Sequence, residues 1–139
     1  MEQQLVPYVF FYGRCEEALE FYKSVFGGSY EIMRVSDAPA DVQSHMPPAA
    51  GSSVMHASFT AGGIKFFASD GMGDSKTIDP DAGNISLALS ASDGAQGEKY
   101  CTALANGGKI TMPFSDAFWG GKFGQVVDKF GNEWMITAP

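Results

Sequence analysis

The sequence predicts an α+β fold in which two paired βαβββ modules form a curled eight-stranded mixed sheet around a cavity. One observation is that the order strand, helix, strand, loop, strand, turn, strand occurs twice along the 139 residues. Another is that both predicted helices end in a glycine pair that leads directly into a strand, at Gly27-Gly28 and Gly107-Gly108. A unit this small cannot bury its sheet alone. We therefore expect a single domain, 1–139, made of two modules at about 1–72 and 82–139.

The first module opens with a strand at residues 5–12, which are β-branched and aromatic, and Pro7 favours an edge position for it. Residues 15–26 are predicted to be a helix because their apolar side chains recur at helical spacing. Glu16 and Glu17 support this start, since acidic side chains are favourable in the first helical turn.

A second strand is predicted at residues 29–35, followed by a proline-rich loop at 37–53 with one helical turn near 40–44. The segments 54–60 and 64–69 flank a glycine turn and form a hairpin. Alternation divides the first of these strands into an apolar face and a more polar one. The more polar face carries Val54, His56, Ser58 and Thr60.

The second module begins with a strand at residues 84–90 and a helix that Ser92 caps and that ends near residue 105. A strand at 109–112 is expected to stop at Pro113. Next comes a loop rich in aromatic residues and glycine. A hairpin with strands at 125–128 and 133–137 closes the module through a turn at Gly131-Asn132.

Composition excludes several classes of function. The net charge is −7 and the nine basic residues are scattered, which argues against nucleic-acid binding and against an anionic membrane surface. No run of 18 apolar residues or signal-peptide pattern is present, so we expect a cytoplasmic protein. Cys15 and Cys101 lie outside any CxxC motif and are predicted to be reduced, buried thiols.

Several short motifs are similar, in order, to the vicinal oxygen chelate superfamily (glyoxalase, bleomycin-resistance and extradiol dioxygenase proteins), and to its PhnB-like branch in particular. They are Pro7-Tyr8, Glu16-Glu-Ala-Leu-Glu-Phe-Tyr22, Phe26-Gly-Gly28, Met55-His56-Ala57, Ser69-Asp70, Gly107-Gly-Lys109, Met112-Pro113, Phe118-Trp-Gly120, Phe123-Gly124 and Asp128-Lys-Phe-Gly131. The resemblance implies paired βαβββ modules with U-shaped sheets and a homodimer. Members of this branch carry a methyltransferase name, but this sequence lacks a glycine-rich turn that opens a helix for a nucleotide-like cofactor.

Enzymes of this superfamily hold a divalent metal with His and Glu side chains on the first and last strands of each module. The corresponding positions here, implied by the resemblance, are Pro7, Phe67, Asn84 and Met135. None is an ordinary ligand for such a metal. We therefore expect no metal and no cofactor at the superfamily's usual site.

His56 is the titratable residue of most interest, because it lies mid-strand on the polar face that we expect to line the cavity. It could act as a general base, a substrate contact or a lone metal ligand, or it could be a structural histidine. Asp70 ends the same hairpin and either pairs with His56 or caps the following turn. If the protein is an enzyme, His56 and Asp70 are its candidate catalytic pair, with Asp128 as another carboxylate within the same hypothesis.

Aromatic residues are the candidate ligand contacts. Phe118, Trp119 and Phe123 stand among glycines and serve either as core plugs or as pocket walls. Alternation places either Trp134 or Met135 on the cavity face of the last strand. The full predicted ligand-binding set is Tyr8, Phe10, His56, Phe67, Phe118, Trp119, Phe123, Trp134 and Met135.

Three hypotheses follow from these residues. The first is a protein that binds a small hydrophobic or aromatic molecule without turnover. The second is a lyase, isomerase or oxygenase that uses His56 and a carboxylate. The third is a structural dimer whose cavity is filled by its own rings.

Overall fold

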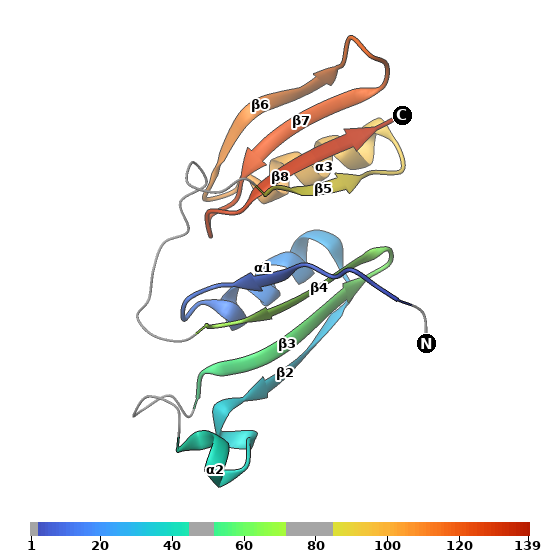
Figure 1. Cartoon of the computed structure of the whole chain (residues 1–139). Coiled ribbons are helices and arrows are strands. Elements are labelled where there is room, and N and C mark those ends of the chain that lie inside the picture. The colour runs from blue at the N-terminus through green and yellow to red at the C-terminus, as the bar shows by residue number, and fades with distance from the viewer. Residues whose placement is uncertain (1–2, 45–51, 72–84) are drawn as a thin grey trace. The chain divides into compact units, whose positions relative to one another are not determined.

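The computed structural model describes residues 3–44, 52–71 and 85–139. The chain divides into two compact units, Met1–Lys76 and Thr77–Pro139. Each unit contains one four-stranded mixed sheet and one long helix (Figure 1). The predicted eight strands and α+β class are confirmed, and the strands are arranged as two sheets of four.

The N-terminal unit has the strand order β1-β4-β3-β2, with β1 parallel to β4 and the other pairs antiparallel. Its elements are β1 (Tyr8–Phe10), α1 (Cys15–Phe26), β2 (Ser29–Arg34), the 3₁₀ turn η1 (Val35–Asp37), α2 (Ala40–Gln43), β3 (Val54–Ala61) and β4 (Ile64–Ser69). The helix and the short helical turn lie where the sequence predicted them. The first strand is shorter than predicted.

The C-terminal unit repeats this topology as β5-β8-β7-β6, again with its first and last strands parallel. Its elements are β5 (Leu87–Ser90), α3 (Gly94–Leu104), β6 (Lys109–Asp116), β7 (Lys122–Val127) and β8 (Glu133–Ala138). The internal repeat predicted from the sequence is thus confirmed at the level of strand order.

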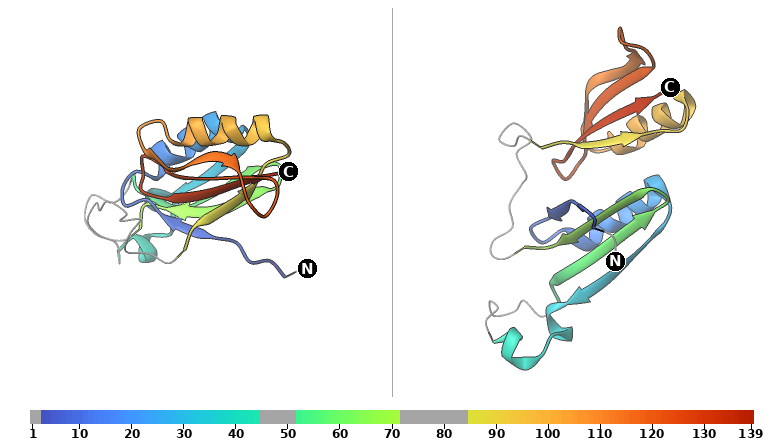
Figure 2. Two further views of the ribbon diagram at one scale, coloured as in Figure 1. Left: turned by 90° about the horizontal axis from the view of Figure 1, so that it is seen from above. Right: turned by 45° about the vertical axis from the view of Figure 1, so that its right-hand side comes forward.

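In each unit the long helix, α1 or α3, lies along one face of that unit's own sheet (Figure 2), and the buried side chains lie between helix and sheet. In the N-terminal unit, the Tyr22 ring packs edge-on against Phe59 and Phe66, and all three side chains are at most 3 % exposed. In the C-terminal unit, Leu104, Val126 and Ile136 are fully buried. This burial leaves the opposite face of each sheet free of its own helix.

The structure corrects three local predictions. The α3 helix is capped by Asp93 rather than Ser92, because the Asp93 carboxylate accepts a hydrogen bond from the backbone N–H of Gln96 at 2.8 Å. Strand β6 continues through Pro113, since it is an edge strand with irregular pairing and does not need that N–H. Phe123 belongs to β7 and not to the preceding loop.

Cys15 and Cys101 are free and buried, as predicted. Among the residues that the structure describes, no helix has the length and apolar character that a membrane crossing requires.

Candidate functional site

An exposed cluster of four rings lies on the N-terminal sheet face that α1 leaves open. Tyr8 and Phe10 come from β1, Phe67 from β4 and His56 from β3. The Tyr8 ring centroid is 5.2 Å from that of Phe10, 5.6 Å from that of His56 and 6.4 Å from that of Phe67. The His56 and Phe67 centroids are 5.2 Å apart. We call these four residues the ring cluster.

Strand register explains why residues so far apart in sequence meet here. Tyr8 pairs directly with Phe67 in the parallel β1–β4 ladder, and side chains two residues apart on a strand share a face. His56 is on β3, which pairs with β4 on its other side. Ala57 and Phe59 point into the core, which leaves His56 on the open face. The sequence predicted the alternation but could not predict the register.

The four rings remain accessible although they touch one another. Tyr8 is 42 % exposed and Phe10 is 47 % exposed. The Tyr8 hydroxyl lies 3.3 Å from His56 Nδ1, and the tautomer of the imidazole decides which of the two groups donates. A planar molecule could therefore stack on the rings and reach polar atoms at the same time.

Asp70 does not join His56. Its Oδ1 accepts a hydrogen bond from the backbone N–H of Cys15 at 2.8 Å, and its Oδ2 accepts one from the backbone N–H of Val54 at 2.7 Å. The carboxylate thus fastens the start of α1 to the start of β3. Burial, with a contribution from the Asp70 charge, raises the pKa of the Cys15 thiol to about 12. No hydrogen bond joins His56 and Asp70, although both lie in the described part of the chain.

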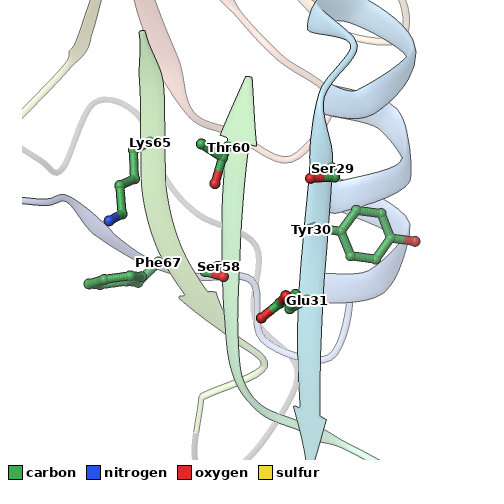
Figure 3. Close-up of a pocket in the computed structure, with 7 residues that line it drawn as sticks. All are labelled: Ser29, Tyr30, Glu31, Ser58, Thr60, Lys65 and Phe67. Carbon is green, nitrogen blue, oxygen red and sulfur yellow. The ribbon is translucent and has the colours of Figure 1, made fainter. Parts of the chain in front are cut away.

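A polar pocket of about 270 Å³ borders the ring cluster and shares Phe67 with it (Figure 3). It is lined by Ser29, Tyr30 and Glu31 of β2, Ser58 and Thr60 of β3, and Lys65 and Phe67 of β4. Figure 3 shows the Tyr30 side chain directed away from the others. The Lys65 ammonium lies 5.7 Å from the centroid of the Phe67 ring. We call this space the polar pocket.

A second set of exposed rings lies in the C-terminal unit, where β6 turns into β7. Trp119 packs edge-on against Phe118 and Phe123, with centroid distances of 4.8 and 5.6 Å. Phe118 is 97 % exposed and Trp119 is 62 % exposed, so neither plugs the core of its own unit. The three rings line a pocket of about 280 Å³ together with Met112, Ser115, Asp116 and Ala117.

The structure shows which of Trp134 and Met135 on β8 faces the core of the C-terminal unit. Trp134 is 3 % exposed, and its Nε1–H donates to Asp128 Oδ2 at 2.9 Å. Asp128 Oδ1 accepts from the backbone N–H groups of Phe130 and Asn132, so this carboxylate organises the turn between β7 and β8. Met135 lies on the other face of β8. The structure therefore groups Met135, and not Trp134, with the open face of that sheet.

The positions that the family resemblance assigns to metal ligands offer no set of donors for a divalent metal among the described residues. The Phe67 backbone N–H donates to the Pro7 carbonyl at 2.9 Å, so these two residues are neighbours, but neither side chain offers a donor atom. Met135 offers only a soft thioether, and Asn84 lies outside the described residues. Within 3–44, 52–71 and 85–139, no three His, Cys, Asp or Glu side chains are grouped as metal ligands.

Glu31 and Lys65 are candidate site residues that the sequence reasoning missed. Alternation alone places Lys65 on the same face as Phe67, and Glu31 on the same face as Ser29. This signal was available, but only the pairing of β2, β3 and β4 shows that the two residues share one pocket.

Comparison with known proteins agrees with this architecture. The sequence profile of the family described as 3-demethylubiquinone-9 3-methyltransferase matches residues 3–137. Protein YjdN of Escherichia coli K12 is 30 % identical over 141 residues, which cover 96 % of this chain and 94 % of YjdN.

Solved structures support the same grouping. Protein PA1353 of Pseudomonas aeruginosa is 31 % identical with a TM-score of 0.82, over 99 % of this chain and 98 % of its own. A PhnB protein of Bacillus cereus is 28 % identical with a TM-score of 0.75, over 99 % and 100 % of the two chains. A glyoxalase/bleomycin resistance/dioxygenase superfamily member from Sphaerobacter thermophilus, at 18 % identity and a TM-score of 0.59 over the full length of both chains, shares the fold. The chain belongs to the PhnB-like family described as 3-demethylubiquinone-9 3-methyltransferase, within the glyoxalase fold.

Proposed function

We propose that this protein binds a small hydrophobic or aromatic molecule on the ring cluster of its N-terminal sheet. The observation that carries the proposal is the exposure of Tyr8 and Phe10 on a face shared with His56 and Phe67. Large rings on an open sheet face are in contact with water, and a planar ligand that stacks on them would displace that water.

The apolar character of the superfamily's metal positions also supports a binding role. Phe67 presents an apolar ring, packed against Tyr8 and His56, at a place where a metalloenzyme would need a charged or imidazole ligand. In the C-terminal unit, Phe118, Trp119 and Phe123 are proposed as ligand contacts of the pocket that they line, and Met135 as a contact on the open face of that unit's own sheet. Trp134 is assigned to the core, because its ring is buried and its N–H is bonded to Asp128.

Ligand-observed NMR with a library of small aromatic compounds tests this function. We expect saturable binding that Phe67→Ala and Tyr8→Ala weaken, because both substitutions remove ring surface from the cluster. Lys99→Gln, on the exposed side of α3, is the matched control and should leave binding unchanged. Trp119→Ala reports whether the C-terminal rings also contribute. If no compound binds saturably, or if Phe67→Ala binds as tightly as the unchanged protein, the proposed function is wrong.

A second candidate function is acid–base catalysis by His56, and the Tyr8–His56 contact of 3.3 Å favours it. Because Asp70 is bonded to two backbone N–H groups, Tyr8 rather than Asp70 would orient the imidazole. The Nε2 atom would then exchange the proton with a ligand stacked on the rings. This is a lyase or isomerase type of chemistry, for which the superfamily offers only an analogy.

Substituting His56 separates the two functions. In a pure binding protein, His56→Gln should weaken aromatic ligands less than Phe67→Ala does, since glutamine lacks the ring but keeps polar atoms at the position. An enzyme should lose conversion of its substrate in His56→Gln while it still binds that substrate. Time-resolved NMR of the compounds that bind detects any conversion.

We further propose that the protein is a homodimer, as the family resemblance implies. Light scattering coupled to size exclusion should give about twice the chain mass of 14.8 kDa. A mass equal to that of one chain would contradict this proposal.

A further inference from the structure

The polar pocket adds a charged binding surface to the ring cluster. Thr60 of β3 pairs with Ser29 on one side and with Lys65 on the other. Ser58, two residues away on the same face, pairs with Glu31 on one side and with Phe67 on the other. Two hydroxyl groups therefore lie in the middle of the face, with an acidic side chain on β2 and a basic one on β4 (Figure 3).

The two charges do not neutralise each other. Neighbouring strands are about 4.8 Å apart, so β2 and β4 are separated by roughly twice that distance across β3. The ion pairs within the described residues are Arg14–Glu17, Arg34–Glu16 and Lys122–Asp116, and none involves Glu31 or Lys65. The pocket thus offers one anionic and one cationic group to a ligand, with hydroxyl donors and acceptors between them.

The polar pocket is small for a complete ligand site. Its volume of about 270 Å³ is below the range of roughly 300–1,000 Å³ that is usual for complete small-molecule sites. Phe67 belongs both to the pocket and to the ring cluster, in contact distance of His56 and Tyr8. A ligand with its ring on Tyr8 and Phe67 would therefore extend its polar end toward Lys65, Thr60 and Glu31.

From this juxtaposition we propose that the ligand is an aromatic molecule with a zwitterionic head group that carries an ammonium and a carboxylate, as in an aromatic amino acid. The carboxylate is bound by the Lys65 ammonium and the hydroxyl groups of Thr60 and Ser58. The ammonium is bound by the Glu31 carboxylate. This inference rests on the proposed function, because it names the ligand class of the same surface.

Isothermal titration calorimetry with four indole probes tests the head group separately from the ring. The probes are L-tryptophan (zwitterion), indole-3-propionate (anion), tryptamine (cation) and 3-methylindole (neutral). We expect L-tryptophan to bind most tightly. Each opposite charge at a partly exposed site should contribute about fivefold in affinity at low salt.

Two charge-neutralising variants assign each charge. Lys65→Gln should weaken L-tryptophan and indole-3-propionate about fivefold and leave tryptamine unweakened. Glu31→Gln should weaken L-tryptophan and tryptamine and leave indole-3-propionate unweakened. Lys99→Gln and Glu98→Gln, both exposed on α3, are the charge-matched controls and should change none of the four affinities.

The outcomes distinguish this inference from the function on which it rests. If all four probes bind equally and only Phe67→Ala weakens them, the ring cluster binds aromatic molecules but the zwitterion proposal is overturned. If indole-3-propionate binds more tightly than L-tryptophan and Glu31→Gln has no effect, the ligand is an anion and the proposal is also overturned. If no probe binds, including 3-methylindole, the zwitterion proposal is overturned, and the ring cluster does not bind indole-type aromatic molecules either.

Discussion

The open sheet face of the N-terminal unit carries His56, Lys65 and Glu31 beside its rings, whereas the same face of the C-terminal unit carries Gln125, Glu133 and Met135. The two units nevertheless share one strand order and one pattern of parallel and antiparallel pairs. The repeat is thus preserved where backbone and core pack, and it has diverged where side chains meet solvent. In this protein, topology and candidate chemistry are determined by different residues.

The glycine pairs show where the two units are still alike. A Cβ atom on Gly28 would lie 2.2 Å from the Thr60 carbonyl oxygen, and one on Gly108 would lie 2.0 Å from the Val127 carbonyl oxygen. Both glycines precede the second strand of their unit and face the third. Each helix can return to its sheet only because the backbone approaches closely at this point.

The two structural carboxylates show where the units differ. Asp128 is 2 % exposed and accepts hydrogen bonds from two backbone N–H groups and the Trp134 indole within one turn. Asp70 accepts from Cys15 and Val54, which lie far apart in sequence. One unit therefore uses its aspartate to close a local hairpin, and the other uses it to join a helix to a strand.

The largest expected effect on stability is that of Asp128→Ala. Removing a buried acceptor leaves three donors without it, and we expect a loss of about 4 kcal/mol in the free energy of unfolding. Asp70→Ala removes an acceptor from two donors at a less buried site and should cost about 2 kcal/mol. Urea titrations followed by circular dichroism measure both values. Equal losses would show that the two aspartates are equivalent despite their different surroundings.

The next effect concerns the first glycine pair. Gly27 and Gly28 both have positive φ, 76° and 81°, but a Cβ on Gly27 meets nothing within 4 Å. Gly27→Ala should therefore cost about 1 kcal/mol from backbone strain alone. Gly28→Ala adds a clash with the Thr60 carbonyl and should cost about 3 kcal/mol. Thermal and urea unfolding of both variants test this difference, and a smaller loss for Gly28→Ala would refute the close-approach argument.

A smaller effect on stability is expected when an exposed ring is removed than when a buried ring is removed. Phe118→Ser removes a ring that is 97 % exposed and should change the free energy of unfolding by less than about 0.5 kcal/mol. Phe59→Ala is the buried reference: it removes a fully buried ring and should cost about 4 kcal/mol, as much as Asp128→Ala. Urea titration compares them. A large loss in Phe118→Ser would mean that its ring supports the folded state rather than a surface for ligands.

The last effect is a pH dependence carried by the thiols. Burial raises the pKa of Cys15 to about 12 and that of Cys101 to about 11, from an unperturbed value of 9.0. Between pH 9 and these values the folded state retains protons that the unfolded state has released, so stability falls as pH rises through this window. Cys15→Ala should flatten the fall between pH 9 and 10.5 relative to the unchanged protein. An unchanged slope would show that the thiol does not ionise differently on unfolding.

Thiol labelling offers a check on the same residues near neutral pH. Both thiols should react slowly with a disulfide reagent at pH 8 in the folded protein, because little thiolate is present. Rapid labelling without denaturant would contradict their burial.

The sequence by itself determined the elements and their repetition. Helical spacing at residues 15–26, alternation in residues 54–60 and the two glycine pairs are local patterns, and each depends on one stretch of chain. The family resemblance rests on the same short motifs. Local patterns failed at Pro113, which an edge strand tolerates, and at Ser92, where the neighbouring Asp93 caps the helix instead.

Tertiary structure alone decided which side chains meet. Asp70 was a candidate partner of His56 because it ends the same hairpin, yet its carboxylate is bonded to the N–H groups of Cys15 and Val54. Tyr8 is the partner of His56 instead, 48 residues away in sequence. Strand register brings these residues together, and a shift of one residue would have turned each side chain to the opposite face. Register depends on the packing of whole strands against α1, which no short stretch of sequence specifies.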